Sequence, residues 1–140
     1  MMENWNKIIL HCSATPEGRN VKTKTIKGWH LKRGWRDIGY HYVIQLDGTV
    51  DKGRPIDQHG AHTKGRNHDS IGICYIGGLD AATKEPKDTM TEAQHDSFLD
   101  LMSALRFVFG PLALHGHNEY AAKACPCFDV QEKFGDLCER

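Results

Sequence analysis

Three side chains that can bind a metal lie far apart in this sequence, and the fold has to unite them. His11 lies near the start of the chain, whereas His117 and Cys125 lie near its end. Two imidazoles and one thiolate can make three corners of a tetrahedral zinc site and leave the fourth corner open for a reactive water. We therefore expect one zinc ion per chain, in a fold whose two ends meet.

The residues around these ligands predict how the fold delivers them. Residues 7–11 are a short apolar run that ends at His11 and is typical of a buried strand. Residues 117–126 are polar and end in proline, which is typical of a loop. Such a loop can fold His117 and Cys125 back toward one point.

The composition is that of one globular domain spanning residues 1–140. Hydrophobic residues make up 39% and charged residues 26% of the chain, which argues against disorder. The 18 basic and 18 acidic residues give a formal net charge of zero, so the net charge produces no overall electrostatic attraction to nucleic acid or to an anionic membrane. The first residues lack a signal-peptide pattern, and no stretch approaches the eighteen or so apolar residues of a membrane span. We expect a monomer that binds neither nucleic acid nor membrane.

Three helices are predicted from capping residues and apolar spacing. Thr23 or Thr25 can cap a helix that Gly34 ends. Residues 91–94 resemble a capping box, and Asp129 can cap a short last helix that runs to residue 134. The apolar positions of the middle helix are Phe98, Leu101, Met102, Leu105 and Val108.

Apolar and β-branched runs predict a sheet with both parallel and antiparallel strands. The Asp47-Gly48 turn between alternating segments predicts a hairpin, and residues 57–69 read as a long surface loop. The fold class is therefore α/β, a central mixed β-sheet flanked by helices. Strands are expected at residues 7–11, 40–44, 49–50, 70–76 and 111–115.

With these residues placed, the chain resembles the zinc-dependent N-acetylmuramoyl-L-alanine amidases of the amidase-2 type, above all the small lysozymes of short-tailed phages. The matching segments occur in the family's order and cover nearly the whole chain. They are residues 9–15, 34–42, 47–50, 60–62, 67–72, 117–119 and 123–126. The resemblance implies a mixed sheet flanked by helices, as in peptidoglycan-recognition proteins, with the zinc in a surface groove.

The same resemblance implies an activity and its residues. The family hydrolyses the amide bond between N-acetylmuramic acid and L-alanine in peptidoglycan, so the chain would be a phage or prophage endolysin. Such an enzyme would wait in the host cytoplasm and reach the cell wall after the membrane is permeabilised. The implied site residues are His11, His117 and Cys125 as zinc ligands, Tyr40 and Lys123 as the catalytic pair, and His62 as a substrate-binding residue.

Two neighbouring side chains compete for the ligand roles. His115 lies two residues before His117, although only His117 has the family's spacing to Cys125. Cys127 stands where a serine is usual in this subgroup and places a second thiol near the metal. An odd count of five cysteines without a signal peptide favours metal ligation and buried thiols over disulfides.

The sequence is also compatible with three other functions. The chain could be a peptidoglycan-binding module without catalysis, although such modules typically lack the cysteine ligand. Cys125 could instead be a nucleophile paired with His117. Phage lysozymes of this type also inhibit the phage's RNA polymerase through the segment before the first strand, but that segment is short here.

Overall fold

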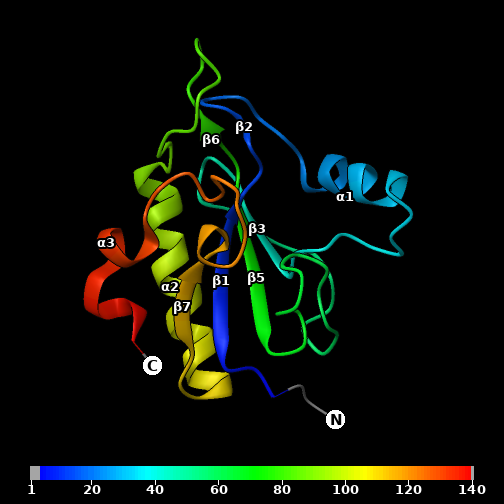
Figure 1. The fold of residues 1–140 in the computed structure, drawn as a ribbon, viewed down its shortest axis with the longest axis vertical. Helices are drawn as coiled ribbons and strands as arrows, with labels where there is room; N and C mark the ends of the chain where they lie inside the picture. The colour runs from blue at the N-terminus through cyan, green and yellow to red at the C-terminus, as the bar shows by residue number, and fades with distance from the viewer. Residues whose placement is uncertain (1–3, 140) are drawn as a thin grey trace.

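A five-stranded sheet forms the centre of the protein (Figure 1), which we describe for residues 4–139 of a computed structural model. The strand order is β4-β3-β5-β1-β7, and only β4 runs antiparallel to its neighbour. This confirms the predicted mixed sheet and the central place of the strand that begins at Ser70. The strands are β1 (Lys7–Cys12), β3 (Tyr42–Ile44), β4 (Val50–Lys52), β5 (Ser70–Tyr75) and β7 (Ala113–Gly116). Of the N-terminal segment considered above, residues 1–3 lie outside the described residues.

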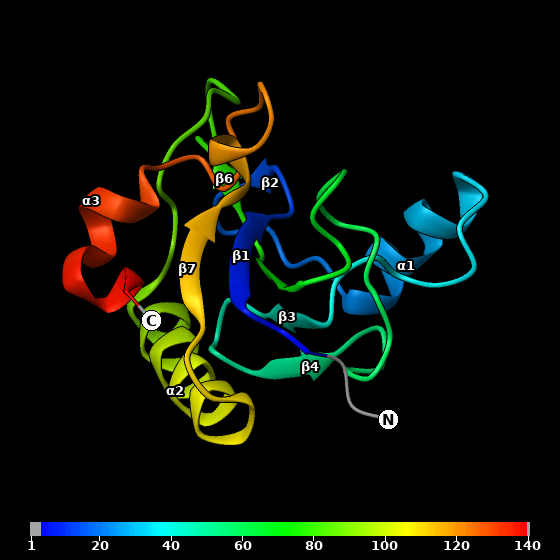
Figure 2. The ribbon, with the colours of Figure 1, turned by 60° about the horizontal axis from the view of Figure 1, so that its bottom comes forward.

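Helices cover both faces of this sheet. Helices α2 (Glu92–Phe109) and α3 (Val130–Phe134) lie on one side and α1 (Thr23–Lys32) lies on the other (Figure 2). Apolar side chains of α2 and α3 share one core cluster with Ile8, Leu10, Ile71 and Ile73. Ile26 of α1 packs in a second cluster with Val43 and Cys74, so the sheet has a core on each face. None of the helices within residues 4–139 is both long and apolar enough to cross a membrane.

Side chains of β1 point alternately to the two faces of the sheet, and this alternation places the candidate ligand His11 on one of them. Ile8, Leu10 and Cys12 belong to the core cluster under α2. Because successive side chains of a strand point to opposite faces, His11 faces the α1 side of the sheet. The candidate site therefore forms on the same side of the sheet as α1.

The capping box of α2 and the cap of α3 are confirmed. The Thr91 side chain accepts a hydrogen bond from the backbone amide of Gln94, and the Asp129 side chain accepts one from the backbone amide of Glu132. The predicted threonine cap of α1 is wrong, because Lys22 occupies the N-cap position and Thr23 donates to Asp51 over 2.7 Å instead. In α2, Val108 is 59% exposed, because the core ends one turn earlier at Leu105.

The hairpin is also confirmed, with small changes. Its turn contains Gly48 at φ +90°, and the Gln45 amide donates to the Thr49 carbonyl over 2.8 Å. Tyr40 and the residue after it precede β3 rather than belonging to it. A two-stranded parallel sheet of β2 (Thr15–Pro16) and β6 (Gly78–Leu79) was not predicted. The 3-10 turns are η1 (His117–Glu119) and η2 (Gly135–Cys138).

Candidate metal centre and its groove

Strand register brings the two candidate histidine ligands side by side. Leu10 of β1 is paired with Gly116 of the parallel strand β7. His11 is the next residue of β1, and His117 directly follows β7 as the first residue of η1, so both lie at the carboxyl edge of the sheet. The edge where parallel strands end is the usual place for binding sites in α/β proteins. The centroids of the two imidazole rings lie 4.6 Å apart.

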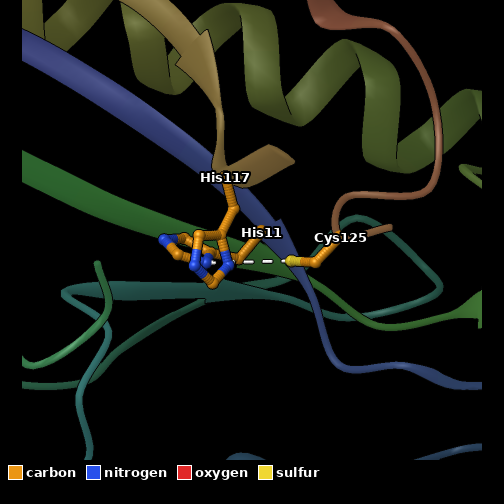
Figure 3. A group of neighbouring side chains, drawn as sticks. All are labelled: His11, His117 and Cys125. Carbon is orange, nitrogen blue, oxygen red and sulfur yellow. Dashed lines mark hydrogen bonds between the residues drawn. The ribbon is translucent and has the colours of Figure 1, made fainter. Parts of the chain in front are cut away.

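Cys125 reaches the same point from the loop that follows η1 (Figure 3). Its Sγ lies 3.8 Å from Nδ1 of His11 and accepts a hydrogen bond of 3.2 Å from the Cys12 amide. One donor atom from each of His11, His117 and Cys125 lies within 4.8 Å of the others. The structure therefore brings together the three predicted ligands as a group that could hold a metal ion.

Several hydrogen bonds hold the loop that carries Cys125. The Tyr75 hydroxyl donates to the Pro126 carbonyl over 2.7 Å, directly after Cys125. Asn118 Nδ2 donates to the Phe128 carbonyl over 3.1 Å, and the Glu119 carboxylate accepts from the Gly116 amide over 2.6 Å. The Cys125–Pro126 peptide bond is cis. Sequence reasoning missed the role of Tyr75, because its partner lies 51 residues away in the chain.

The structure separates the two competing side chains from this group. His115 Nδ1 lies 2.9 Å from Glu119 Oε1, outside the metal-binding group. Cys127 Sγ lies 3.6 Å from Cys12 Sγ. The donors that converge are thus His117 and Cys125, as the sequence predicted.

A groove of about 680 Å³ opens beside the candidate metal centre. Predicted site residues along it are Tyr40, His62, His117, Lys123 and Cys125. Its walls also include His30, Trp35 and Tyr120, which sequence reasoning did not assign to the site. A second hollow of about 620 Å³, near Thr23 and Asp51, contains none of the predicted site residues.

The groove has a positive character. The charged residues among the described residues that line it are Arg33, Lys64 and Lys123, without any Asp or Glu. A concave surface with charges of one sign attracts ligands of the opposite sign. The groove is therefore suited to a substrate that carries carboxylates.

Burial and neighbouring charges favour the neutral form of the two candidate histidine ligands. Burial lowers the pKa of His11, and the charges of His62, His117 and Lys123 lower it further. Burial and the Lys123 charge lower the pKa of His117 as well. A metal binds the neutral form of imidazole, so these shifts favour binding at neutral pH.

Tyr40 lies against the same centre. Its ring centroid is 5.1 Å from that of His11 and 5.4 Å from that of His30. Burial raises the pKa of the Tyr40 phenol above its usual value. The phenol is therefore protonated at neutral pH and can donate a hydrogen bond.

The fold and the site define a hydrolase of the amidase class, and the comparison with protein families agrees. The family described as N-acetylmuramoyl-L-alanine amidase, Amidase_2, matches residues 1–128. The chain belongs to this family and is an N-acetylmuramoyl-L-alanine amidase that lyses peptidoglycan.

Known relatives share most of the chain. The endolysin of Escherichia phage T7 is 43% identical over 129 residues, which are 92% of this chain and 85% of the phage protein. An endolysin N-acetylmuramoyl-L-alanine amidase from Clostridium intestinale has a TM-score of 0.80 at 28% identity, covering 94% of this chain and 84% of its own. Peptidoglycan recognition protein ectodomains in complex with tracheal cytotoxin also give a TM-score of 0.80, at 26% identity, over 98% of this chain and 84% of theirs.

Proposed function

We propose that this amidase is a zinc-dependent endolysin that cleaves the bond between the lactyl group of N-acetylmuramic acid and L-alanine. The observation that carries the proposal is the convergence of His11, His117 and Cys125 within 4.8 Å, beside a groove that also contains Tyr40 and Lys123. The relatives named as endolysins and as an N-acetylmuramoyl-L-alanine amidase support it.

The donor set fits one zinc ion. Two imidazole nitrogens and one thiolate are ligands that zinc prefers, and three protein ligands are typical of a catalytic rather than a structural site. When bound there, zinc would polarise the scissile carbonyl and acidify water, which addresses the low reactivity of an amide. The lowered pKa values of His11 and His117 suit this role because the ligands must be deprotonated.

Tyr40 would serve as a donor in the reaction. Because burial keeps its phenol protonated, Tyr40 Oη can donate a hydrogen bond to the carbonyl oxygen of the scissile amide as negative charge develops there. The same proton can pass to the departing nitrogen of L-alanine, which must be protonated to leave as an amine, and the proton that the attacking water loses would then restore the Tyr40 phenol.

Lys123 would stabilise the same developing charge. It lines the groove, and its charge acts on both histidine ligands, as their lowered pKa values indicate. A preorganised positive group near an oxyanion typically contributes about 3–4 kcal/mol to catalysis. His62 also lines the groove, and its substrate-binding role stays a prediction.

The proposed place of action is the host cell wall. We infer that the protein is made in the host cytoplasm and reaches peptidoglycan after the membrane is permeabilised. Expression alone should then leave cells intact, whereas rapid lysis without a permeabilising partner would contradict this route. Inhibition of a phage RNA polymerase and the monomeric state stay predictions, which a transcription assay and light scattering would test.

The zinc proposal has a direct test in metal content and reversible inhibition. Purified protein should contain one zinc per chain, lose peptidoglycan hydrolysis on treatment with EDTA and regain it when zinc is added. Retention of activity after complete metal removal, with inactivation by alkylation of Cys125, would favour a cysteine nucleophile instead. Tight peptidoglycan binding by the zinc-loaded protein without any release of peptides would favour a binding module.

A further inference from the structure

Both ring nitrogens of His62 already have partners inside the protein. Nδ1 lies 2.9 Å from Nε2 of His11, and Nε2 lies 3.3 Å from the carbonyl oxygen of Ser70. The residue is only 8% exposed, which leaves little of it for a substrate. We propose that His62 is a positioning residue that orients His11 for metal binding. This inference rests on the metal site proposed above.

The partners of His62 determine where its hydrogen lies. The Ser70 carbonyl can only accept, and the Ser70 hydroxyl, 3.4 Å from Nε2, already donates to the Arg66 carbonyl over 2.6 Å. Both groups that face Nε2 therefore act as acceptors, so Nε2 carries the hydrogen. A neutral imidazole has one donor and one acceptor nitrogen, which makes Nδ1 of His62 the acceptor.

The tautomer of His62 also determines which ring nitrogen of His11 carries the hydrogen. The acceptor Nδ1 of His62 faces Nε2 of His11, so Nε2 of His11 must be the donor. The Thr63 hydroxyl, 3.0 Å from His62 Nδ1 and 3.3 Å from His11 Nε2, can take part without changing this result. It can donate to His62 and accept from His11. The other nitrogen of His11, Nδ1, is then unprotonated and faces Cys125 Sγ at 3.8 Å.

The position of the His62 ring is itself fixed from two sides. The ring packs against Gly72 in β5, where a Cβ atom would lie 2.5 Å from Cγ of His62. Asn67 Oδ1 accepts hydrogen bonds from the amides of His62 and Thr63, at 3.0 and 2.9 Å. A histidine ligand commonly donates its second N–H to a fixed acceptor, which selects the tautomer and orients the ring. In this protein the acceptor is a second histidine.

The zinc affinity of two variants tests the proposal. His62→Phe keeps an aromatic ring but removes the acceptor, whereas His62→Asn keeps an oxygen acceptor close to the position of Nδ1. We expect zinc to bind roughly 10- to 100-fold more weakly to His62→Phe in competition with a chelator, with much of the loss recovered in His62→Asn. His68→Asn, an exposed histidine of the same loop, is the matched control and should bind zinc like the unmodified protein.

The tautomer of His11 gives a second readout, which in the unmodified protein depends neither on activity nor on the folding of a variant. Nitrogen–proton NMR correlations of the metal-free protein should show His11 protonated at Nε2, and this preference should be lost in His62→Phe. A role limited to packing would lower thermal stability without changing the tautomer. An Nδ1-protonated His11 in the unmodified protein would overturn the inference.

The outcomes separate this inference from the proposed function. Absence of zinc from the unmodified protein would contradict the metal site, while the tautomer would still test His62. Unchanged zinc affinity in folded His62→Phe would overturn the positioning role. If KM alone rises in that variant, His62 binds substrate instead.

Discussion

The hydroxyl of Tyr75 donates a hydrogen bond of 2.7 Å to the carbonyl oxygen of Pro126. Tyr75 is fully buried at the end of the central strand β5, whereas Pro126 directly follows the candidate ligand Cys125. This hydrogen bond thus ties the loop that carries Cys125 to the buried centre of the sheet.

Removal of this hydroxyl should loosen the loop. Tyr75→Phe leaves the Pro126 carbonyl without its partner, so we expect the free energy of unfolding to fall by about 1–3 kcal/mol. Urea denaturation of the metal-free protein measures this change, with Tyr42→Phe on β3 as the matched control outside the loop. An unchanged free energy of unfolding would mean that water replaces the bond at no cost.

The two thiols that flank Pro126 should behave differently when each is replaced by serine. Cys125 Sγ lies 3.8 Å from His11 Nδ1, whereas Cys127 Sγ lies 3.6 Å from Cys12 Sγ. Cys125→Ser should therefore lose zinc and activity together, because affinity depends on all three ligands. Cys127→Ser should keep both. The zinc content of each variant after dialysis tests this expectation. Loss of zinc from Cys127→Ser but not from Cys125→Ser would show that the wrong thiol has been assigned as the ligand.

The sequence predicted those features that depend on local signals or on the family pattern. The capping box at Thr91 and the turn at Gly48 are local, and each has a backbone requirement that few residues satisfy. The resemblance identified the residues that the structure brings together at the candidate metal centre. The strand β5 was predictable because a continuous apolar run is typical of a strand buried on both faces.

Features that depend on tertiary contacts could not be predicted. Thr23 is a favourable capping residue, but its hydroxyl donates a hydrogen bond to Asp51, which lies 28 residues away in the sequence. Strands β2 and β6 have two residues each, too few to produce a periodic pattern. The contact between His62 and His11 spans 51 residues and involves a loop without regular structure, so only the fold could show it.

Tyr40 and Lys123 should be needed for the chemistry and not for the metal. Tyr40→Phe removes one hydroxyl, and Lys123→Met removes one charge while keeping most of the side chain's length. Each should lower kcat for peptidoglycan hydrolysis by roughly 10²–10³-fold. Zinc content and melting temperature should stay nearly constant. Near-normal turnover by either zinc-loaded variant would rule out its catalytic role, and loss of zinc would make that residue structural.

Acid should destabilise the metal-free protein through its buried histidines. Nδ1 of His30 accepts a hydrogen bond of 2.8 Å from the Gly39 amide, and burial lowers the pKa of His30 to about 4. In the unfolded chain the pKa of this histidine is about 6.5, so between about pH 6.5 and pH 4 the unfolded chain binds more protons than the folded protein. The free energy of unfolding should therefore fall as pH falls through this window, by up to about 1.4 kcal/mol per pH unit from His30.

His30→Asn tests this origin of the pH dependence. The Asn side chain can accept from the Gly39 amide but does not titrate, so denaturation midpoints measured from pH 7 to pH 4 should vary less than in the unmodified protein. His68→Asn, at an exposed position, is the matched control. An unchanged slope in His30→Asn would assign the acid sensitivity to other groups.

The central claim is tested most directly by identifying the bond that the zinc-loaded protein cleaves in a defined muropeptide. Mass spectrometry should find one water added across a single bond, giving a peptide with a free L-alanine amino terminus and a saccharide with a free lactyl carboxylate. The zinc-loaded Lys123→Met variant should give almost none of either product. Cleavage within the glycan, cleavage between two amino acids, or an intact muropeptide after incubation with protein that contains one zinc per chain would contradict the account.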